Sequence, residues 1–225
     1  MEIKDRTDHD PATDILLVDA YMRWALMAAE EVVGKNGLAV VLRQSGLEQF
    51  VGNYPPEQLK VTTGLTLTHY AALNAGLLNF FGRAARSMSL RIGRQSARYA
   101  IEHQGALFGT AALLASKVLP MSTQIKMGLS AMQAGFRRLS QTVGQDRHME
   151  LEDRGETWAY LDYDDPTSAG KSSDEPIGWV QTGAIQEALR WQIGKDFDVE
   201  QVACRSMGAP ASIWLVNKTP KMPTA

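Results

Sequence analysis

Few side chains in this sequence have the type and spacing that metal or thiol chemistry requires. The chain has one cysteine, Cys204, and four histidines, His9, His69, His103 and His148. A structural zinc site normally takes four thiolate or imidazole ligands, and these histidines show no paired i, i+4 spacing. We therefore expect no metal site and no intrachain disulfide. Cys204 is interpreted as a small buried residue on a strand.

Carboxylates could supply acid–base chemistry near the C-terminal part of the chain. Glu200 with Arg205, or Asp162 with Asp164 and Asp165, could exchange protons, but solvated surface charge is the interpretation we favour. The sequence has no nucleophile elbow, no phosphate-binding P-loop and no dinucleotide-binding glycine motif. Reduction would need a nicotinamide, a flavin or a metal, because side chains cannot supply a hydride. We expect no cofactor, and absence of enzyme activity is favoured over its presence.

Arginines form the most conspicuous charged pattern. Arg83, Arg86, Arg91, Arg94 and Arg98 fall partly on one helical stripe. Solvent exposure beside Glu partners is the first interpretation. The second is a clamp for the carboxylate of an amphipathic ligand, since guanidinium groups bind carboxylates in a bidentate manner. The formal net charge of −2 and the lack of a recognition helix argue against binding to nucleic acid.

Five tryptophans and ten methionines fall mainly on faces predicted to point inward. Such side chains adapt to irregular apolar ligands and line pockets well. Ordinary core packing explains them at least as well when the residues alone are considered. A pocket between helices and a sheet is the alternative.

The elements that would position these residues follow from hydrophobic periodicity and from Gly and Pro breaks. Asp14 is the expected cap of the first helix. Helices are expected over residues 14–34, 38–44, 66–81, 84–102, 105–118, 123–143 and 178–193, and strands over 148–153, 157–163, 199–204 and 212–216. The apolar stretch 105–118 is shorter than the roughly 20 residues that a membrane span needs, so we expect a buried core helix there.

This order predicts an α+β fold in which helices pack on an antiparallel sheet. We expect a disordered tail over residues 1–13, one ligand-binding domain over 14–218, and a second tail over 219–225. The polar, acidic N-terminal residues do not form a secretory signal. A reducing, cytoplasmic setting fits the single cysteine.

The C-terminal unit carries a family resemblance. A helix with Gly183 leads into a strand with Glu200 and Cys204 four residues apart, and a turn follows at Gly208 and Pro210 before a last strand. This pattern resembles the vinyl-reductase-type small-molecule-binding domain, also called "hydrocarbon binding". A second similarity lies in the N-terminal half, at residues 33–38, 41–47 and 53–55.

The resemblance implies a fold similar to transport-complex (TRAPP) subunits and haem–nitric-oxide-binding sensors, and a homodimer. Sensing activators of this type bind zinc with one Glu and three Cys. Here only Cys204 matches a ligating cysteine, and Ser212 stands at the second cysteine position. The similarity to accessory proteins of bacteriochlorophyll biosynthesis implies a tetrapyrrole intermediate as the ligand. A fatty acid or a hydrocarbon is the other candidate.

We therefore predict a binding protein that acts as a carrier, an accessory factor or a sensor for a hydrophobic small molecule, with no integral membrane segment. The alternatives are a vinyl reductase acting on a chlorophyll precursor and a homo-oligomeric assembly subunit. The resemblance and the aromatic supply together give the candidate ligand-binding residues. These are Tyr70, Phe81, Phe108, Trp158, Trp179, Trp191, Cys204 and Arg91.

Overall fold

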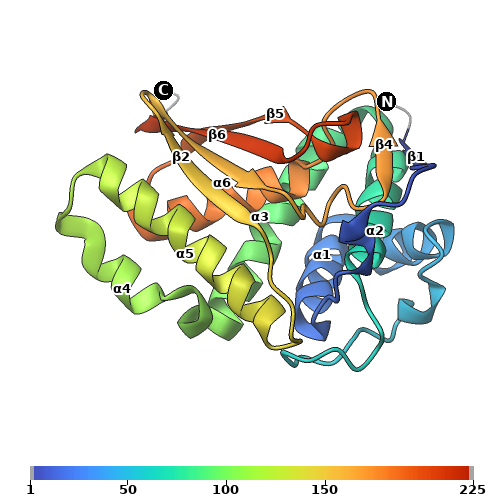
Figure 1. Ribbon diagram of the computed structural model, residues 1–225. Coiled ribbons are helices and arrows are strands. Elements are labelled where there is room, and N and C mark those ends of the chain that lie inside the picture. The colour runs from blue at the N-terminus through green and yellow to red at the C-terminus, as the bar shows by residue number, and fades with distance from the viewer. Residues whose placement is uncertain (1–2, 223–225) are drawn as a thin grey trace.

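A computed structural model describes residues 3–222 of the chain. A four-stranded sheet lies on one side and helices lie on the other (Figure 1). The helices are α1 (Asp19–Gln44), α2 (Leu67–Phe81), α3 (Ala85–Gln104), α4 (Thr110–Ala115), α5 (Met121–Gln141) and α6 (Trp179–Ile193). The strands are β1 (Ile3–Asp5), β2 (Met149–Arg154), β3 (Thr157–Asp162), β4 (Lys171–Ser173), β5 (Phe197–Ala203) and β6 (Ser212–Pro220). The predicted α+β class is confirmed.

The main sheet is antiparallel throughout, with strand order β2-β3-β6-β5. Its inner face packs on α5 and α6 (Figure 1). In the register of β3 and β6, Tyr160 stands opposite Trp214, and the two fully buried rings meet edge to face at 6.2 Å. Such aromatic cross-strand pairs help to fix the register of a sheet.

Helices α3 and α6 cross in close contact because each carries a glycine at the crossing. A Cβ atom added to Gly93 would lie 1.9 Å from the carbonyl oxygen of Val180. A Cβ atom added to Gly183 would lie 2.2 Å from the carbonyl oxygen of Leu90. Backbone therefore meets backbone at this crossing, and no larger residue fits either position.

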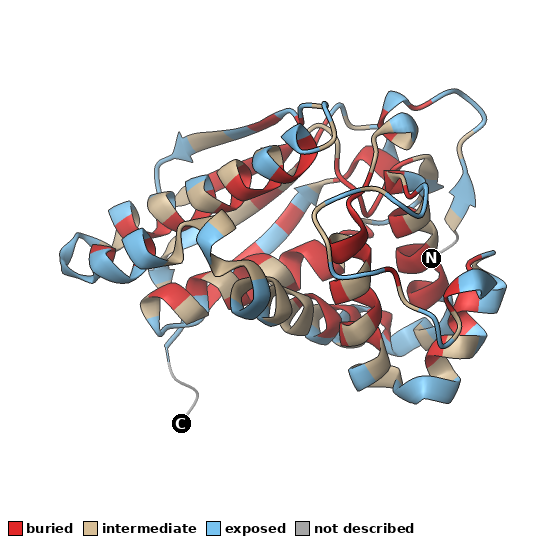
Figure 2. Cartoon of the chain, turned by 90° about the horizontal axis from the view of Figure 1, so that it is seen from below, coloured by how far each residue is buried: buried red, intermediate tan, exposed pale blue. Residues whose placement is uncertain are grey.

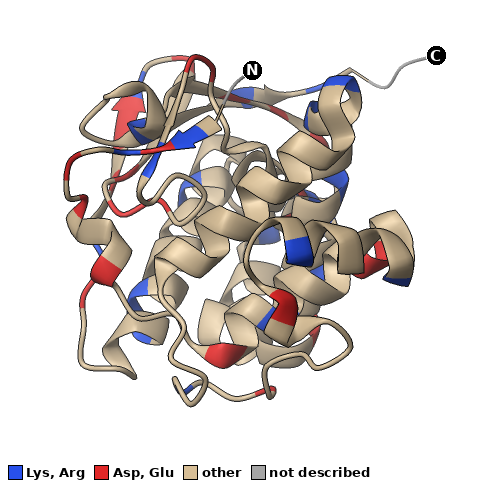
Figure 3. Ribbon diagram, turned by 90° about the vertical axis from the view of Figure 1, so that its right-hand side faces the viewer, with Lys and Arg blue, Asp and Glu red and all other residues tan. Residues whose placement is uncertain are grey.

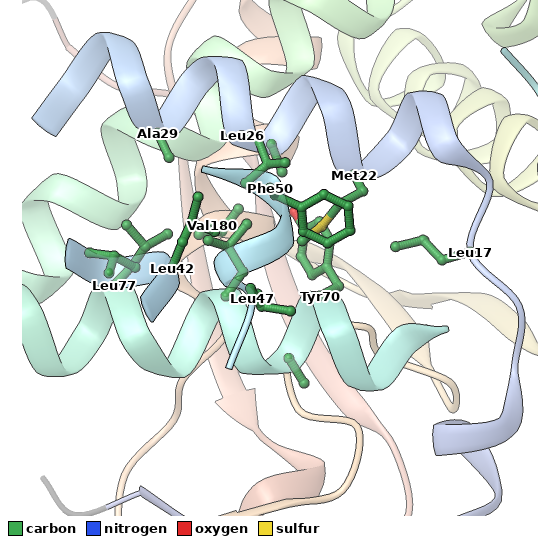
Figure 4. Packing of buried hydrophobic residues seen from close by; sticks show 14 of the residues in the cluster. Leu17, Met22, Leu26, Ala29, Leu42, Leu47, Phe50, Tyr70, Leu77 and Val180 are labelled. Carbon is green, nitrogen blue, oxygen red and sulfur yellow. The ribbon is translucent and has the colours of Figure 1, made fainter. Parts of the chain in front are cut away.

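Helices α1 and α2 enclose the second part of the core. Met22 and Leu26 on α1 point toward Tyr70 on α2 (Figure 4). Gly34, with φ of 73° and ψ of 161°, interrupts α1, one residue before the break expected at residues 35–37. Asp14 does not cap α1. Asp10 instead caps a short 3-10 turn over Pro11–Asp14, and α1 begins at Asp19.

The structure corrects the expected tails. Strand β1 pairs with β4, and the carboxylate of Asp10 is buried 2.6 Å from the guanidinium of Arg205, so residues 3–13 are ordered rather than a disordered tail. At the other end, β6 continues to Pro220, and the ammonium of Lys221 lies 2.8 Å from Asp198. Residues 1–2 and 223–225 of the two expected tails lie outside the described residues.

The apolar stretch 105–118 is not the buried core helix that its hydropathy predicts. It divides into 3-10 turns at Gly105–Phe108 and Ser116–Val118 with α4 between them, and Gly109 adopts a left-handed φ of 65°. Most of its residues are exposed or half-buried (Figure 2, left). We call residues 105–120 the flap. Among the described residues, no helix combines the length and the apolarity needed to cross a bilayer.

Candidate functional site

A cavity of about 60 Å³ lies between α3, α5 and α6, and the flap closes one side. Small side chains create the space, because alanines on three helices leave room that larger residues would fill. The alanines of the wall are Ala97, Ala100, Ala131, Ala184 and Ala188. A water molecule needs about 10–15 Å³ of such space, so the cavity is small for an organic guest in this state.

Aromatic rings form the floor and the closure of the cavity. Tyr21 of α1 contacts Tyr70 with ring centroids 5.1 Å apart and meets Phe136 edge to face at 5.6 Å. Phe108 of the flap meets Phe136 at 6.0 Å. Trp24 and Trp191 complete the aromatic part of the wall. The site is thus an apolar space with aromatic edges.

The wall includes no Asp, Glu, Lys, Arg or His among the residues that the structure describes. Three of its buried polar atoms have no hydrogen-bond partner within this part of the chain: Nε1 of Trp24, Nε2 of Gln181 and Oε1 of Gln192. The amide nitrogen of Gln192 donates to Ser116 Oγ at 3.1 Å and to the carbonyl of Gln124 at 2.9 Å, which leaves its oxygen as the free acceptor. Most buried polar groups in proteins are paired, so three unpaired atoms on the residues of one wall are unusual.

The two phenols in the wall stay neutral. Burial raises the pKa of Tyr21 to about 12 and raises the pKa of Tyr70 well above its ordinary value of 10. Beyond Tyr21 lies a buried ion pair, in which Arg147 donates to Asp162 at 2.6 Å. This pair lies outside the cavity wall, so the wall carries no net charge.

Three of the eight predicted ligand-binding residues meet at this cavity: Tyr70, Phe108 and Trp191. The other five lie elsewhere. Trp158 faces Lys126 and Lys218, Trp179 lies under Arg86, Phe81 closes the end of α2, Arg91 is exposed on α3, and Cys204 lies in a separate buried cluster. Ligand contact by any of the eight stays a prediction.

Sequence reasoning missed most of the wall. Tyr21 and Trp24 lie within the helix expected over residues 14–34, but nothing local marks them as cavity residues. The sequence does not indicate that Gln181 and Gln192 line a cavity, because a glutamine is usually expected at the protein surface. The available signal was the alanines at helical spacing, Ala97 with Ala100 and Ala184 with Ala188, which indicates a face without bulk.

Cys204 belongs to a hydrogen-bonded cluster that collects several residues of the C-terminal pattern. Its sulfur lies 2.9 Å from Ser206 Oγ and 4.0 Å from Ser212 Oγ, and Ser212 donates to Asp165 at 2.6 Å. Burial raises the pKa of the Cys204 thiol. Asp162, Asp165 and Arg205 are buried, so solvated surface charge was the wrong interpretation for all three. Within residues 3–222, no three His, Cys, Asp or Glu side chains form a metal-binding group.

Comparisons with known proteins agree with this arrangement. Residues 162–211 match the model of the 4-vinyl reductase domain, a stretch that runs from the end of β3 through α6 and β5 to the residue before β6. No curated protein shows significant sequence similarity to the chain.

Several solved structures with a similar fold are H-NOX proteins. An Fe(II) unliganded H-NOX mutant from K. algicida has a TM-score of 0.58 at 12% identity, covering 92% of this chain and 98% of that chain. An H-NOX structure used to probe haem distortion has a TM-score of 0.57 at 12% identity, covering 93% and 99%. An oxygen-binding H-NOX domain related to soluble guanylate cyclases has a TM-score of 0.55, also at 12% identity and the same coverage. The predicted similarity to the haem–nitric-oxide-binding fold is confirmed.

The cavity of this chain does not fit a haem. Haem iron takes a His, Cys, Met or Tyr ligand, usually an imidazole or a thiolate, and the wall offers neither. All four histidines lie on other surfaces: His9 beside Asp14, His69 at the cap of α2, His103 on Glu57 and His148 on Tyr163. Met132 is in the wall, but Met binds haem iron together with a His. The raised pKa of Tyr21 and of Tyr70 disfavours the phenolate that would bind iron.

The family model thus covers the helix, the strand and the turn on which the resemblance rests, and it ends one residue before the last strand. Gly183 lies at the crossing of α3 and α6, Cys204 in the buried cluster, and Gly208 at the turn before β6. The match confirms the predicted family resemblance: residues 162–211 are similar to the 4-vinyl reductase domain.

Proposed function

We propose that this chain binds an uncharged, mainly apolar small molecule in the cavity between α3, α5 and α6, as a carrier, an accessory factor or a sensor. The observation that carries the proposal is an apolar wall with three unpartnered polar atoms, on Trp24, Gln181 and Gln192, among the described residues. The match to the 4-vinyl reductase domain and the H-NOX-like fold support a domain that binds small molecules.

The chemistry of the wall selects the class of guest. Burial of apolar area stabilises a complex by about 25 cal/mol per Å² before association costs are counted. A guest that donates to Gln192 and accepts from Gln181 or Trp24 also relieves unpaired buried atoms, each of which costs about 1–3 kcal/mol. A charged guest would lose its hydration without gaining a counter-charge.

The size of the cavity requires the flap to move. Pockets for organic ligands usually measure about 300–1,000 Å³, far above the volume seen here. Phe108 is the bulkiest flap residue in the wall, so displacing its ring makes room for a ring-sized hydrocarbon. A tetrapyrrole intermediate or a fatty acid requires the whole flap to lift, and a carboxylate on either would have to remain outside the wall.

Native mass spectrometry of protein purified from its own cells tests for a retained guest. Quenching of tryptophan fluorescence by the neutral probe N-phenyl-1-naphthylamine tests the site itself, because Trp24 and Trp191 are in the cavity wall. Ala131→Leu fills the cavity from α5, whereas Ala134→Leu places the same side chain on α5 outside the wall. Probe binding should be lost in the first variant and kept in the second. Equal binding by both variants contradicts the proposal.

A further inference from the structure

The outer side of the flap exposes an unusual set of apolar side chains. Leu114, Val118 and Leu119 are 46%, 89% and 39% exposed, within six residues of one another. Phe108 and Leu113 of the same flap line the cavity. The flap is therefore one layer thick, with apolar side chains toward the cavity and toward the outside. Exposed apolar groups that cluster in this way usually mark an interaction site.

The flap itself carries positive charge. Lys117 is the one ionisable side chain among residues 105–120. Lys117 is exposed beside Val118, and the exposed Arg138 of α5 donates to the carbonyl of Leu107 in the flap at 2.9 Å. The far end of the molecule, which includes β1 and β4, carries both signs of charge instead (Figure 3).

We propose that the outer face of the flap, formed by Leu114, Lys117, Val118 and Leu119, docks on a lipid bilayer that contains anionic lipids. The apolar side chains enter the interface, and Lys117 lies among the head groups. Segments that bind bilayer surfaces combine apolar side chains with Lys and Arg in this way. The inference extends the proposed function, because a guest dissolved in the bilayer could then reach the cavity without crossing water.

The charge at this face argues against pairing of two copies through the flap. A two-fold dimer brings the same patch of both subunits together. Lys117 and Arg138 would then face their own equivalents, and like charges at an interface disfavour association. The patch also rests on three apolar side chains, fewer than the roughly 20–30 residues a side of a stable protein interface. An expected homodimer would use another face.

Vesicle flotation of the full chain tests the docking face. Vesicles of phosphatidylcholine alone are compared with vesicles that also contain phosphatidylglycerol. Binding should require phosphatidylglycerol and weaken as salt is raised. Lys117→Ala should lower affinity about fivefold, the equivalent of about 1 kcal/mol per cation near an anionic surface. Val118→Asp should abolish binding, whereas Val202→Asp, at a 47% exposed position on β5, should leave it unchanged.

Two further measurements separate this inference from the proposed function. Titration with N-phenyl-1-naphthylamine in the absence of vesicles should be unchanged in Val118→Asp, because Val118 is outside the cavity wall. If the unmodified chain binds the probe but does not bind vesicles, the proposed docking face is wrong and the proposed cavity site is retained. Equal loss of vesicle binding in the Val118 and Val202 variants also overturns it. So does a dimer, seen by light scattering, that Val118→Asp splits into monomers.

Discussion

The ring of Phe108 lies directly on Gly135. A Cβ atom added to Gly135 would stand 2.3 Å from the Phe108 ring, closer than real Cβ contacts come. Because Gly135 has no side chain, α5 leaves a space at this point in which the Phe108 ring of the flap packs. We call this space the seat. Because the contacting atoms belong to a side chain at the half-buried root of the flap, the ring can leave this seat without distortion of α5.

Phe108→Ala should enlarge the cavity and strengthen the binding of N-phenyl-1-naphthylamine, since the probe no longer has to displace a ring. The variant should lose about 2 kcal/mol of unfolding free energy, less than a fully buried Phe→Ala because Phe108 is half-buried. Gly135→Ala should act in the same direction by pushing the ring from its seat. Fluorescence titration and urea unfolding measure the two effects.

Leu107→Ala is the matched control for these variants, because Leu107 is a half-buried neighbour of Phe108 that is not in the wall. It should weaken the flap without raising probe affinity. If Phe108→Ala binds the probe more weakly than the unmodified chain, the ring contributes to binding and does not obstruct it.

Gly183→Ala tests the crossing of α3 and α6. Helix propensity alone predicts that this change stabilises α6 by about 1 kcal/mol. The new methyl group would instead meet the carbonyl oxygen of Leu90, which belongs to the backbone and cannot rotate away. We expect a net loss of about 1–3 kcal/mol in urea unfolding, as for an overpacked core. A gain in stability would show that the two helices can separate freely.

Local sequence patterns predicted the C-terminal unit closely, because the residues that end its helix and mark its strand are close together in the sequence. Gly194 ends α6 in the left-handed conformation that a glycine cap requires, and alternation along β5 marks the strand. The same rules failed at the flap. Its apolar composition predicted one buried helix over residues 105–118, but Gly105 and Gly109 break that helix. They failed also for Asp10, whose partner Arg205 lies almost the whole length of the chain away.

The candidate site was predicted only in part, for a related reason. Large aromatics such as Tyr70 and Trp191 are visible in a sequence as potential wall residues. The volume of a cavity, however, depends on which wall side chains are small. In the sequence, Ala97 and Ala184 cannot be told from other alanines in helices. The unpaired oxygen of Gln192 arises only because its nitrogen reaches Ser116, and that contact depends on tertiary packing.

The thiol of Cys204 should be unreactive in the native state. It is fully buried, and burial raises its pKa, so little thiolate is present at neutral pH. Alkylation by iodoacetamide should be about 100-fold slower than in the unfolded chain, because it requires local opening that costs a few kcal/mol. Mass spectrometry with and without denaturant gives the two rates. Fast modification of the folded chain would contradict the buried cluster.

The pH dependence of stability should carry a signature of Asp162. Burial raises the pKa of Asp162 to about 6, despite the opposing charge of Arg147, from an ordinary value of 3.8. The folded state therefore takes up this proton more readily than the unfolded state. The stabilisation from this group is fully present below about pH 4 and is lost as the pH rises through 6.

Asp162→Asn removes the titrating group but keeps a side chain of similar shape that can still accept from Arg147. The unfolding free energy of Asp162→Asn minus that of the unmodified chain should therefore increase from pH 4 to pH 7. Asp174→Asn changes an exposed carboxylate and should leave the pH profile as it was. Because Asp10 and Asp19 have lowered pKa values and give slopes of the opposite sign, only the difference between variants isolates Asp162. Identical profiles for Asp162→Asn and the unmodified chain would mean that the carboxylate keeps an ordinary pKa beside Arg147.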